Sequence, residues 1–375
     1  MSRSLLSTVG LAALLSQLLA GCPGRVALTQ TPVSLFAYIT QFNTNEVAVV
    51  DAVLKTPTGT PIKVGAGPVK MALKPTGSQE YLYVLNQTGS TVSFVNRRSG
   101  STEEEVAAGT NPDDIAISPD GKWLFVTSPG AGTVTRLNVT SRIADQTLTL
   151  GSGFKPRGIV VNPACQKAAN GDCAALTIYV VNEAVTTQTG SAGNVTKTGQ
   201  VRVLTSQSSG LVDGPTIQLN GAERPLRATI DQAGKNLFIT DTELGSGMWR
   251  IDTGSSAAIL FGQSPVGQTH DVEVANDGTV YATIPRKNQY VQIKPEGSAL
   301  LFPDQTKIRD TQPEAIAFNH DQSELWIGFI GTSTVAYATV QTGGRLFDLR
   351  AVAFSLSSQT KQPPRDIVLA GGAGN

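Results

Sequence analysis

Short blocks in which apolar residues alternate with polar or small ones recur along the chain, separated by turn-forming residues. One block consists of a proline, two variable residues, and then an apolar, a variable and an apolar residue. Its seven copies begin at Pro68, Pro112, Pro156, Pro225, Thr269, Pro313 and Pro364, with threonine replacing proline in the copy at 269. Successive copies start 44, 44, 69, 44, 44 and 51 residues apart, and such regular spacing indicates a structural repeat.

Each repeat predicts four short strands. In the second copy, the strand 112–117 is followed by the turn 118–121 and by strands at 123–127 and 133–137. The Asp-Gly pair in the turn tolerates positive φ and therefore suits a tight hairpin. Strands at this spacing without helical periodicity predict an all-β fold, and a unit of 44 residues with four strands is typical of a propeller blade. We expect a seven-bladed β-propeller of four-stranded antiparallel blades over residues 34–375.

The two ends of the chain predict how the ring closes. The segments 35–39, 46–50 and 61–64 match the second, third and fourth strands of a repeat that has no first strand. The last copy, 364–369, is a first strand with nothing after it. One blade is therefore expected to combine both ends of the chain, which removes the open sheet edges that promote aggregation.

The repeats resemble a known family. Residues 81–96 (YLYVLNQTGSTVSFVN) and 118–127 (SPDGKWLFVT) are similar to the YVTN-type repeat of bacterial surface and periplasmic propellers, a superfamily that includes lactonase-like propellers. The resemblance covers nearly all of residues 34–370, but its motifs are structural and imply no particular reaction. The signatures of WD repeats and of quinone-cofactor propellers are absent from the sequence.

The first residues are typical of an export signal. Arg3 precedes the apolar segment 5–15, which is too short to span a bilayer. The sequence Leu-Ala-Gly before Cys22 resembles a bacterial lipobox, in which the cysteine receives diacylglycerol. We expect a signal peptide over 1–21, lipidation of Cys22, and a tether over 22–33 that holds the propeller close to a membrane. Pro23 favours the outer membrane, with the propeller on the periplasmic or cell-surface side.

Two further cysteines lie in one polar segment. Cys165 and Cys173 would be in an oxidising compartment, so we expect a disulfide between them. A metal site would need more cysteines or histidines nearby. They belong to the longest repeat, whose extra residues fall within 163–199. We expect a surface loop there, with a binding face as the alternative.

Composition excludes some functions. The chain has 29 Lys and Arg residues and 29 Asp and Glu residues, so it has no net positive charge that would attract nucleic acid. There is no phosphate-binding loop, dinucleotide fingerprint, haem-attachment motif or nucleophile elbow. We therefore expect no cofactor, no nucleic-acid partner and a monomer. His320 lies where other repeats have turn residues, and we interpret it as one.

Aligning the seven repeats brings charged residues to one place. The first strand of a blade lines the central channel, so the two residues after each proline should meet at one mouth of it. They predict a ligand-binding ring formed by Asp113, Asp114, Arg157, Arg227, His270, Asp271, Glu314, Arg365 and Asp366, together with Lys70. A solvated rim of weak ion pairs is the alternative. Converging polar groups in a concavity would instead bind a ligand, and the carboxylates and His270 would offer acid–base groups or a hard-metal site.

Two functions follow as hypotheses. The first is a lipid-anchored extracytoplasmic interaction or ligand-binding module that is not an enzyme and takes a protein or a small polar ligand. The second is a lactonase-like hydrolase or lyase with its site at the channel mouth.

Overall fold

The computed structural model describes residues 35–74, 80–189, 195–243, 247–262, 268–303, 312–319, 321–341, 346–352 and 364–370. The predicted signal peptide, Cys22, the tether and His320 lie outside the described residues. The described part of the chain contains no helix long and apolar enough to cross a membrane.

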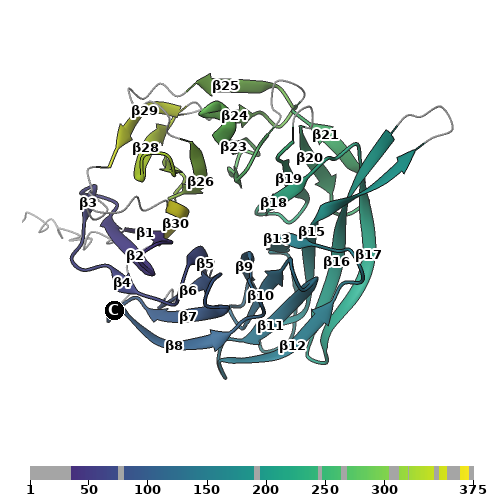
Figure 1. Ribbon diagram of the computed structural model, residues 1–375, viewed down its shortest axis with the longest axis horizontal. Coiled ribbons are helices and arrows are strands. Elements are labelled where there is room, and N and C mark those ends of the chain that lie inside the picture. Colours follow the sequence, from purple (N-terminus) through teal and green to yellow (C-terminus); the bar gives the residue numbers. More distant parts are fainter. Residues whose placement is uncertain are drawn as a thin grey trace, which may run out of the picture. The chain divides into compact units, whose positions relative to one another are not determined.

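Seven antiparallel sheets are arranged in a ring, which confirms the seven-bladed β-propeller (Figure 1). We number the blades 1 to 7 from β1 onward. Their innermost strands are, from blade 1 to blade 7, β30 (Pro364–Ala370), β5 (Pro68–Leu73), β9 (Asp114–Ile117), β13 (Pro156–Val161), β18 (Pro225–Ile230), β22 (Val272–Val274) and β26 (Pro313–Phe318). The second strands, in the same order, are β1 (Phe36–Gln41), β6 (Tyr81–Asn86), β10 (Trp123–Ser128), β15 (Cys173–Thr189), β19 (Asn236–Asp241), β23 (Val280–Ile284) and β27 (Glu324–Phe329).

The outer half of each blade follows the same order. The third strands are β2 (Glu46–Asp51), β7 (Thr91–Asn96), β11 (Thr133–Asn138), β16 (Val195–Gln207), β20 (Met248–Asp252), β24 (Gln289–Ile293) and β28 (Thr334–Val340). The fourth strands are β3 (Thr56–Pro57), β8 (Ser101–Ala107), β12 (Ile143–Thr149), β17 (Gly210–Asn220), β21 (Ala258–Phe261), β25 (Ala299–Pro303) and β29 (Leu346–Ala351). The short strands β4 (Ile62–Lys63) and β14 (Gln166–Lys167) pair with β2 and β15, and η1 (Pro285–Lys287) is a single 3-10 turn.

The second strands are apolar along their length because both of their faces are covered. Leu124 and Phe125 are adjacent in β10 and both are fully buried, but they belong to different core clusters. Leu124 packs between blades 2 and 3, and Phe125 packs between blades 3 and 4. Seven such clusters alternate with the seven blades. The core is therefore a ring of interfaces between sheets, and the channel is left to the innermost strands.

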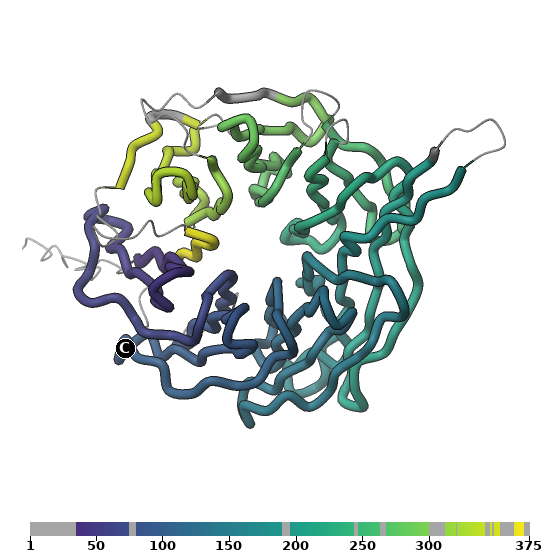
Figure 2. The backbone as a smooth tube through the Cα atoms, viewed as in Figure 1, coloured from purple at the N-terminus to yellow at the C-terminus, as the bar shows by residue number. Residues whose placement is uncertain are grey.

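The ring closes in blade 1, as predicted. β1 pairs antiparallel with β30, from Phe36 opposite Ala370 to Gln41 opposite Pro364. The core between blades 7 and 1 contains Ile39 and Ile367 from the two ends of the chain together with Trp326 of blade 7. Figure 2 shows the first and last described segments, purple and yellow, side by side in one blade, with the yellow segment nearer the channel.

Blade 4 differs from the others in its long hairpin. The predicted disulfide between Cys165 and Cys173 is present, next to β14. The prediction of a surface loop over 163–199 is wrong for its second half, because 186–189 pair in register with 195–198 as an extension of β15 and β16. Threonines in this segment favour extended backbone. Figures 1 and 2 show this ribbon projecting beyond the rim of the ring.

Candidate functional site

A cavity of about 380 Å³ lies where the innermost strands begin, and all seven blades contribute to its wall. Seven of the nine residues of the predicted ligand-binding ring line it, as does Lys70. These seven are Asp113, Arg157, Arg227, His270, Asp271, Glu314 and Arg365. We call this cavity the mouth pocket. The other two, Asp114 and Asp366, line a second cavity of about 170 Å³ deeper in the channel.

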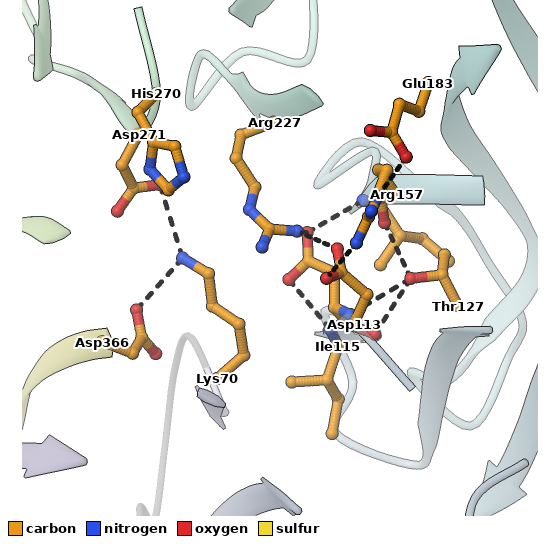
Figure 3. Close-up of polar contacts among 12 residues, drawn as sticks. Lys70, Asp113, Ile115, Thr127, Arg157, Glu183, Arg227, His270, Asp271 and Asp366 are labelled. Atoms are coloured by element: carbon orange, nitrogen blue, oxygen red, sulfur yellow. Dashed lines mark hydrogen bonds and ion pairs between the residues drawn. The ribbon is translucent and has the colours of Figure 1, made fainter. Parts of the chain in front are cut away.

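Ion pairs cross the channel between the two cavities. Lys70 Nζ lies 3.1 Å from Asp366 Oδ1 and 3.4 Å from Asp271 Oδ1, which belong to blades 1 and 6. Burial alone would lower the pKa of Lys70, but the two carboxylates raise it above its ordinary value. Figure 3 shows Lys70 and Arg227 side by side, with Asp271 and Asp366 on one side and Asp113 on the other. Because Lys70, Arg227 and Asp271 line both cavities, they form the partition between them.

Asp113 holds two arginines from different blades. Its Oδ1 accepts a hydrogen bond from Arg157 Nη1 at 2.8 Å, and its Oδ2 accepts one from Arg227 Nη1 at 2.5 Å. Burial would raise the pKa of Asp113, but Arg227 and Arg157 outweigh burial and hold the pKa below its ordinary value. Asp113 is therefore a fixed anion with both oxygens in use.

The aspartates at the second position after the proline have a structural role. Asp114 Oδ2 accepts the backbone N–H of Ile159 at 3.1 Å, and Asp271 Oδ2 accepts that of Ile316 at 3.2 Å. Asp366 Oδ2 accepts the backbone N–H of Met71 at 2.7 Å. In each case the donor lies on the innermost strand of the next blade. These carboxylates join neighbouring blades, a role that the sequence alignment did not distinguish from ligand binding.

Threonines at the end of the second strands reinforce these connections. The Thr127 hydroxyl accepts the backbone N–H of Asp114 at 3.1 Å and donates to the carbonyl of Arg157 at 2.7 Å, in the next blade. Thr283 makes the same two contacts with Asp271 and Glu314, at 3.0 and 3.1 Å. The innermost strands are therefore positioned by side chains as well as by core packing, which fixes the residues of the mouth pocket.

His270 lines the mouth pocket with one ring nitrogen unpaired. Among the described residues, its buried Nδ1 has no hydrogen-bond partner. Burial lowers the pKa of His270 below its ordinary value, although Glu314 acts in the opposite direction. The imidazole of His270 is therefore neutral near pH 7 and can exchange a proton or a hydrogen bond with a ligand.

Glu273, on β22, lies deeper in the channel and lines the second cavity. It keeps some accessible surface inside the channel, but the surrounding strands keep it away from bulk water. This burial, with Asp271 nearby, raises the pKa of Glu273 to about 8. Burial likewise raises the pKa of Asp366, to about 6, although Lys70 opposes the shift.

Four charged residues of this region were missed by the sequence analysis, namely Glu183, Arg224, Arg286 and Glu273. Glu183 Oε2 accepts from Arg157 Nε at 2.7 Å, and its Oε1 accepts from Arg224 Nη2 at 2.6 Å. Arg224 lines the mouth pocket and immediately precedes the proline of its repeat. Glu183 lies in β15, directly after Asn182, the last residue of that strand that pairs with β13. Aligning these two flanking positions would have found Glu183 and Arg224. Phe42, which occupies the position of Glu183 in blade 1, also lines the pocket.

The predicted metal alternative finds no support in the geometry. Asp271 and Asp366 are joined to Lys70, and Glu314 Oε1 accepts from Arg365 Nη1 at 2.6 Å. Across the ranges that the structure describes, no group of three or more His, Cys, Asp or Glu side chains is placed to hold a metal ion. The arrangement instead offers fixed charges, guanidinium donors and one neutral imidazole around a concavity.

Comparisons with known proteins bear on the fold. No family model matches the chain, and a search of curated proteins finds no match either. Among solved structures, a catalytically inactive histidine variant of virginiamycin B lyase from Staphylococcus aureus, with quinupristin, has a TM-score of 0.58 and 15% identity, covering 90% of this chain and 97% of that one. A proposed 6-phosphogluconolactonase from Bacteroides fragilis gives 0.61 and 11%, covering 91% and 99%. A protein from Lactobacillus plantarum gives 0.63 and 13%, covering 90% and 99%. At these identities the likeness shows the propeller fold alone.

Proposed function

We propose that this protein is a lipid-anchored extracytoplasmic β-propeller that binds a small polar ligand in the mouth pocket. The observation that carries the proposal is the convergence of charged side chains from seven blades on one cavity of about 380 Å³. Such a volume is within the usual range for small-molecule sites. The ion pairs of Lys70 and Arg227 close its floor, so a ligand would enter and leave by the mouth.

Binding is better supported than catalysis because most acid–base candidates are already engaged. Both oxygens of Asp113 accept from arginines, and Glu314 accepts from Arg365. A general acid or base must be within reach of the proton it transfers and must have a pKa near the working pH. Of the acid–base groups that line the mouth pocket, His270 best meets that requirement, and a hydrolase or lyase would usually need a second group beside it.

The enzymatic alternative rests on His270 and on the solved structures that are similar to this fold. The buried, unpartnered Nδ1 and the lowered pKa suit proton transfer. Two of the similar structures are described as a virginiamycin B lyase and a proposed 6-phosphogluconolactonase. A reaction of either kind at the mouth pocket is therefore the second candidate function.

One experiment addresses both candidates. Full-length protein is incubated with a small-molecule extract of the envelope of its own cells, and the retained compounds are identified by mass spectrometry. We expect a compound that wild type retains and Arg157→Gln loses. Arg202→Gln is the matched control, because Arg202 is also in blade 4 and ion-paired, 2.9 Å from Asp213, but is not among the residues lining the mouth pocket. Retention by Arg157→Gln at the wild-type level would refute the site. Recovery of a converted compound would establish the enzymatic alternative.

The membrane anchor has its own test. Wild-type protein is expected in the membrane fraction, and Cys22→Ala is expected to be soluble or to keep its signal peptide. Membrane fractionation of Cys22→Ala that does not differ from wild type would contradict lipidation at this residue.

A further inference from the structure

The charges that line the mouth pocket are unequal in number. Six cationic side chains face three carboxylates across the described wall. The carboxylates are Asp113, Asp271 and Glu314, and the cations are Lys70, Arg157, Arg224, Arg227, Arg286 and Arg365. A ligand that enters this pocket meets an excess of positive charge at close range.

The carboxylates are also less accessible than the guanidinium groups. The side chains of Asp113 and Glu314 are 7% and 11% exposed, whereas those of Arg224 and Arg365 are 44% and 39% exposed. Each carboxylate is covered by the cation that it holds. The groups available at the open surface of the pocket are therefore mainly N–H donors.

Several of these donors have no acceptor within the described residues. Within the part of the chain that the structure describes, Arg227 Nε is buried without a hydrogen-bond partner, and Arg286, which is exposed at the mouth, forms no ion pair. A guanidinium group carries five N–H donors and no acceptor. The unused hydrogen-bonding capacity of the pocket consequently calls for a ligand rich in acceptors, and the fork of donors matches a planar oxyanion.

The opposite arc of the pocket is different in character. Phe42 of blade 1 and Val69 of blade 2 line it together with the uncharged Gln87. The guanidinium group of Arg365 lies 5.8 Å from the centre of the Phe42 ring. The cationic arc comes from blades 4 to 6, with Arg157, Arg224, Arg227 and Arg286. The pocket therefore has apolar surface on the side of blades 1 and 2, beside Arg365 and Lys70, and four arginines on the side of blades 4 to 6.

We propose that the ligand of the mouth pocket is a small organic carboxylate with an apolar group. Its carboxylate binds the arginines of blades 4 to 6, and its apolar group lies against Phe42 and Val69. The inference rests on the proposed ligand-binding function and adds the chemical class of the ligand. The excess of positive charge would attract a phosphate as well, so the choice of a carboxylate rests on its planar geometry, in which two oxygens can accept from two N–H groups of one guanidinium.

The test uses probes that share one apolar chain and differ in charge. Hexanoate, hexanamide, hexylamine and hexyl phosphate are titrated into the full-length protein, and binding is followed by calorimetry. We expect hexanoate to bind at least about tenfold more tightly than hexanamide, as a charge-assisted contact to arginine predicts. Its affinity should fall as the salt concentration rises.

Variants separate the two sides of the pocket. Arg286→Gln removes no ion pair and should weaken hexanoate about threefold or more, with little effect on hexanamide. Arg250→Gln, in blade 5 and outside the pocket wall, is the matched control and should bind like wild type. Phe42→Ala should weaken hexanoate but not acetate, because acetate has too short a chain to reach the apolar side.

The outcomes distinguish this inference from the proposed function. Hexanamide, hexylamine or hexyl phosphate binding as tightly as hexanoate would overturn the carboxylate class. So would the absence of hexanoate binding, or hexanoate binding that Arg286→Gln and Arg224→Gln leave unchanged. The ligand-binding function would survive each of these results if the envelope extract still yields a compound that Arg157→Gln loses. If the extract yields none, the function itself fails.

Discussion

Where the second position after the proline is an aspartate, it and its neighbour at the first position have different tasks. At the first position after the proline, Asp113, His270, Glu314 and Arg365 face the mouth pocket. At the second position, Asp114, Asp271 and Asp366 accept a backbone N–H of the next blade. In blades 1 and 3 both positions are charged, so charge alone does not reveal the task. The difference lies in the partner of each carboxylate. A backbone N–H inside the ring has no water to bond to when its carboxylate is lost. A side-chain partner at the mouth can bond to water instead.

The largest effect is expected when the residues at both positions of one blade are deleted together. Deletion of residues 364–370 removes Arg365 and Asp366 with the whole of β30 and leaves β1 without its inner partner. We expect loss of the cooperative fold, because Ile39 and its neighbours in the closing core become exposed. Calorimetry and limited proteolysis measure the effect, with deletion of 371–375 alone as control. A 364–370 deletion that melts like wild type would refute the closure.

Single substitutions should separate the two positions. Asp366→Ala leaves the Met71 N–H without its acceptor and removes the nearer partner of Lys70, so we expect a loss of about 3–5 kcal/mol in the free energy of unfolding. Glu314→Ala leaves Arg365 able to reach water, and its loss should be below about 1 kcal/mol. Chemical denaturation at pH 7.5 measures both. Equal losses would contradict the division between the two positions.

Glu273 lies deeper in the channel than both of these positions, and its raised pKa should make stability depend on pH. Its pKa of about 8 in the folded protein lies above the ordinary glutamate value, so the folded state binds the proton more tightly than the unfolded state. Stability should therefore fall as the pH rises from about 4.5 to 8. Glu273→Gln should remove this part of the decline and melt at a higher temperature than wild type at pH 8.5, but not at pH 4.5. Parallel pH profiles of the two proteins would contradict the raised pKa.

The smallest effect on stability is expected at His270. Because Nδ1 has no partner among the described residues, His270→Ala breaks no hydrogen bond of that atom, and we expect a change below about 1 kcal/mol. Retention of the envelope compound should nevertheless fall. The melting temperature and the mass-spectrometric assay measure the two effects. A loss of stability equal to that of Asp366→Ala would assign His270 to the architecture.

The repeat made most of the fold predictable. Because the second strands are covered on both faces, their apolar runs and the spacing of the prolines identify seven blades and the closing strand. The ribbon of 186–189 and 195–198 was not predicted, since Gly, Ser and Thr residues without alternating apolar positions look like a loop. Backbone pairing, which leaves no mark on the hydrophobic pattern, holds it in place.

The candidate site was predictable in position but not in detail. The alignment brought the charged residues to one mouth because equivalent positions of a propeller meet around its axis. It could not tell Asp113 from Asp114, since their partners come from blades 4 and 5, far away in sequence. Glu183 and Arg224 were missed because they flank the repeated block instead of lying in it.

The pairing of β1 with β30 also determines the order in which the protein can fold. Phe36 and Ala370 are neighbours in one sheet although 334 positions separate them (370 minus 36). Blades 2 to 7 consist of consecutive strands and can form as the chain emerges, but β1 has no inner partner until the final segment arrives. Contacts of such long range form slowly, and an unpaired edge invites other chains to add to it. Aggregation with other copies of the chain is therefore most favoured just before the last step of folding, while the edge of β1 is still unpaired.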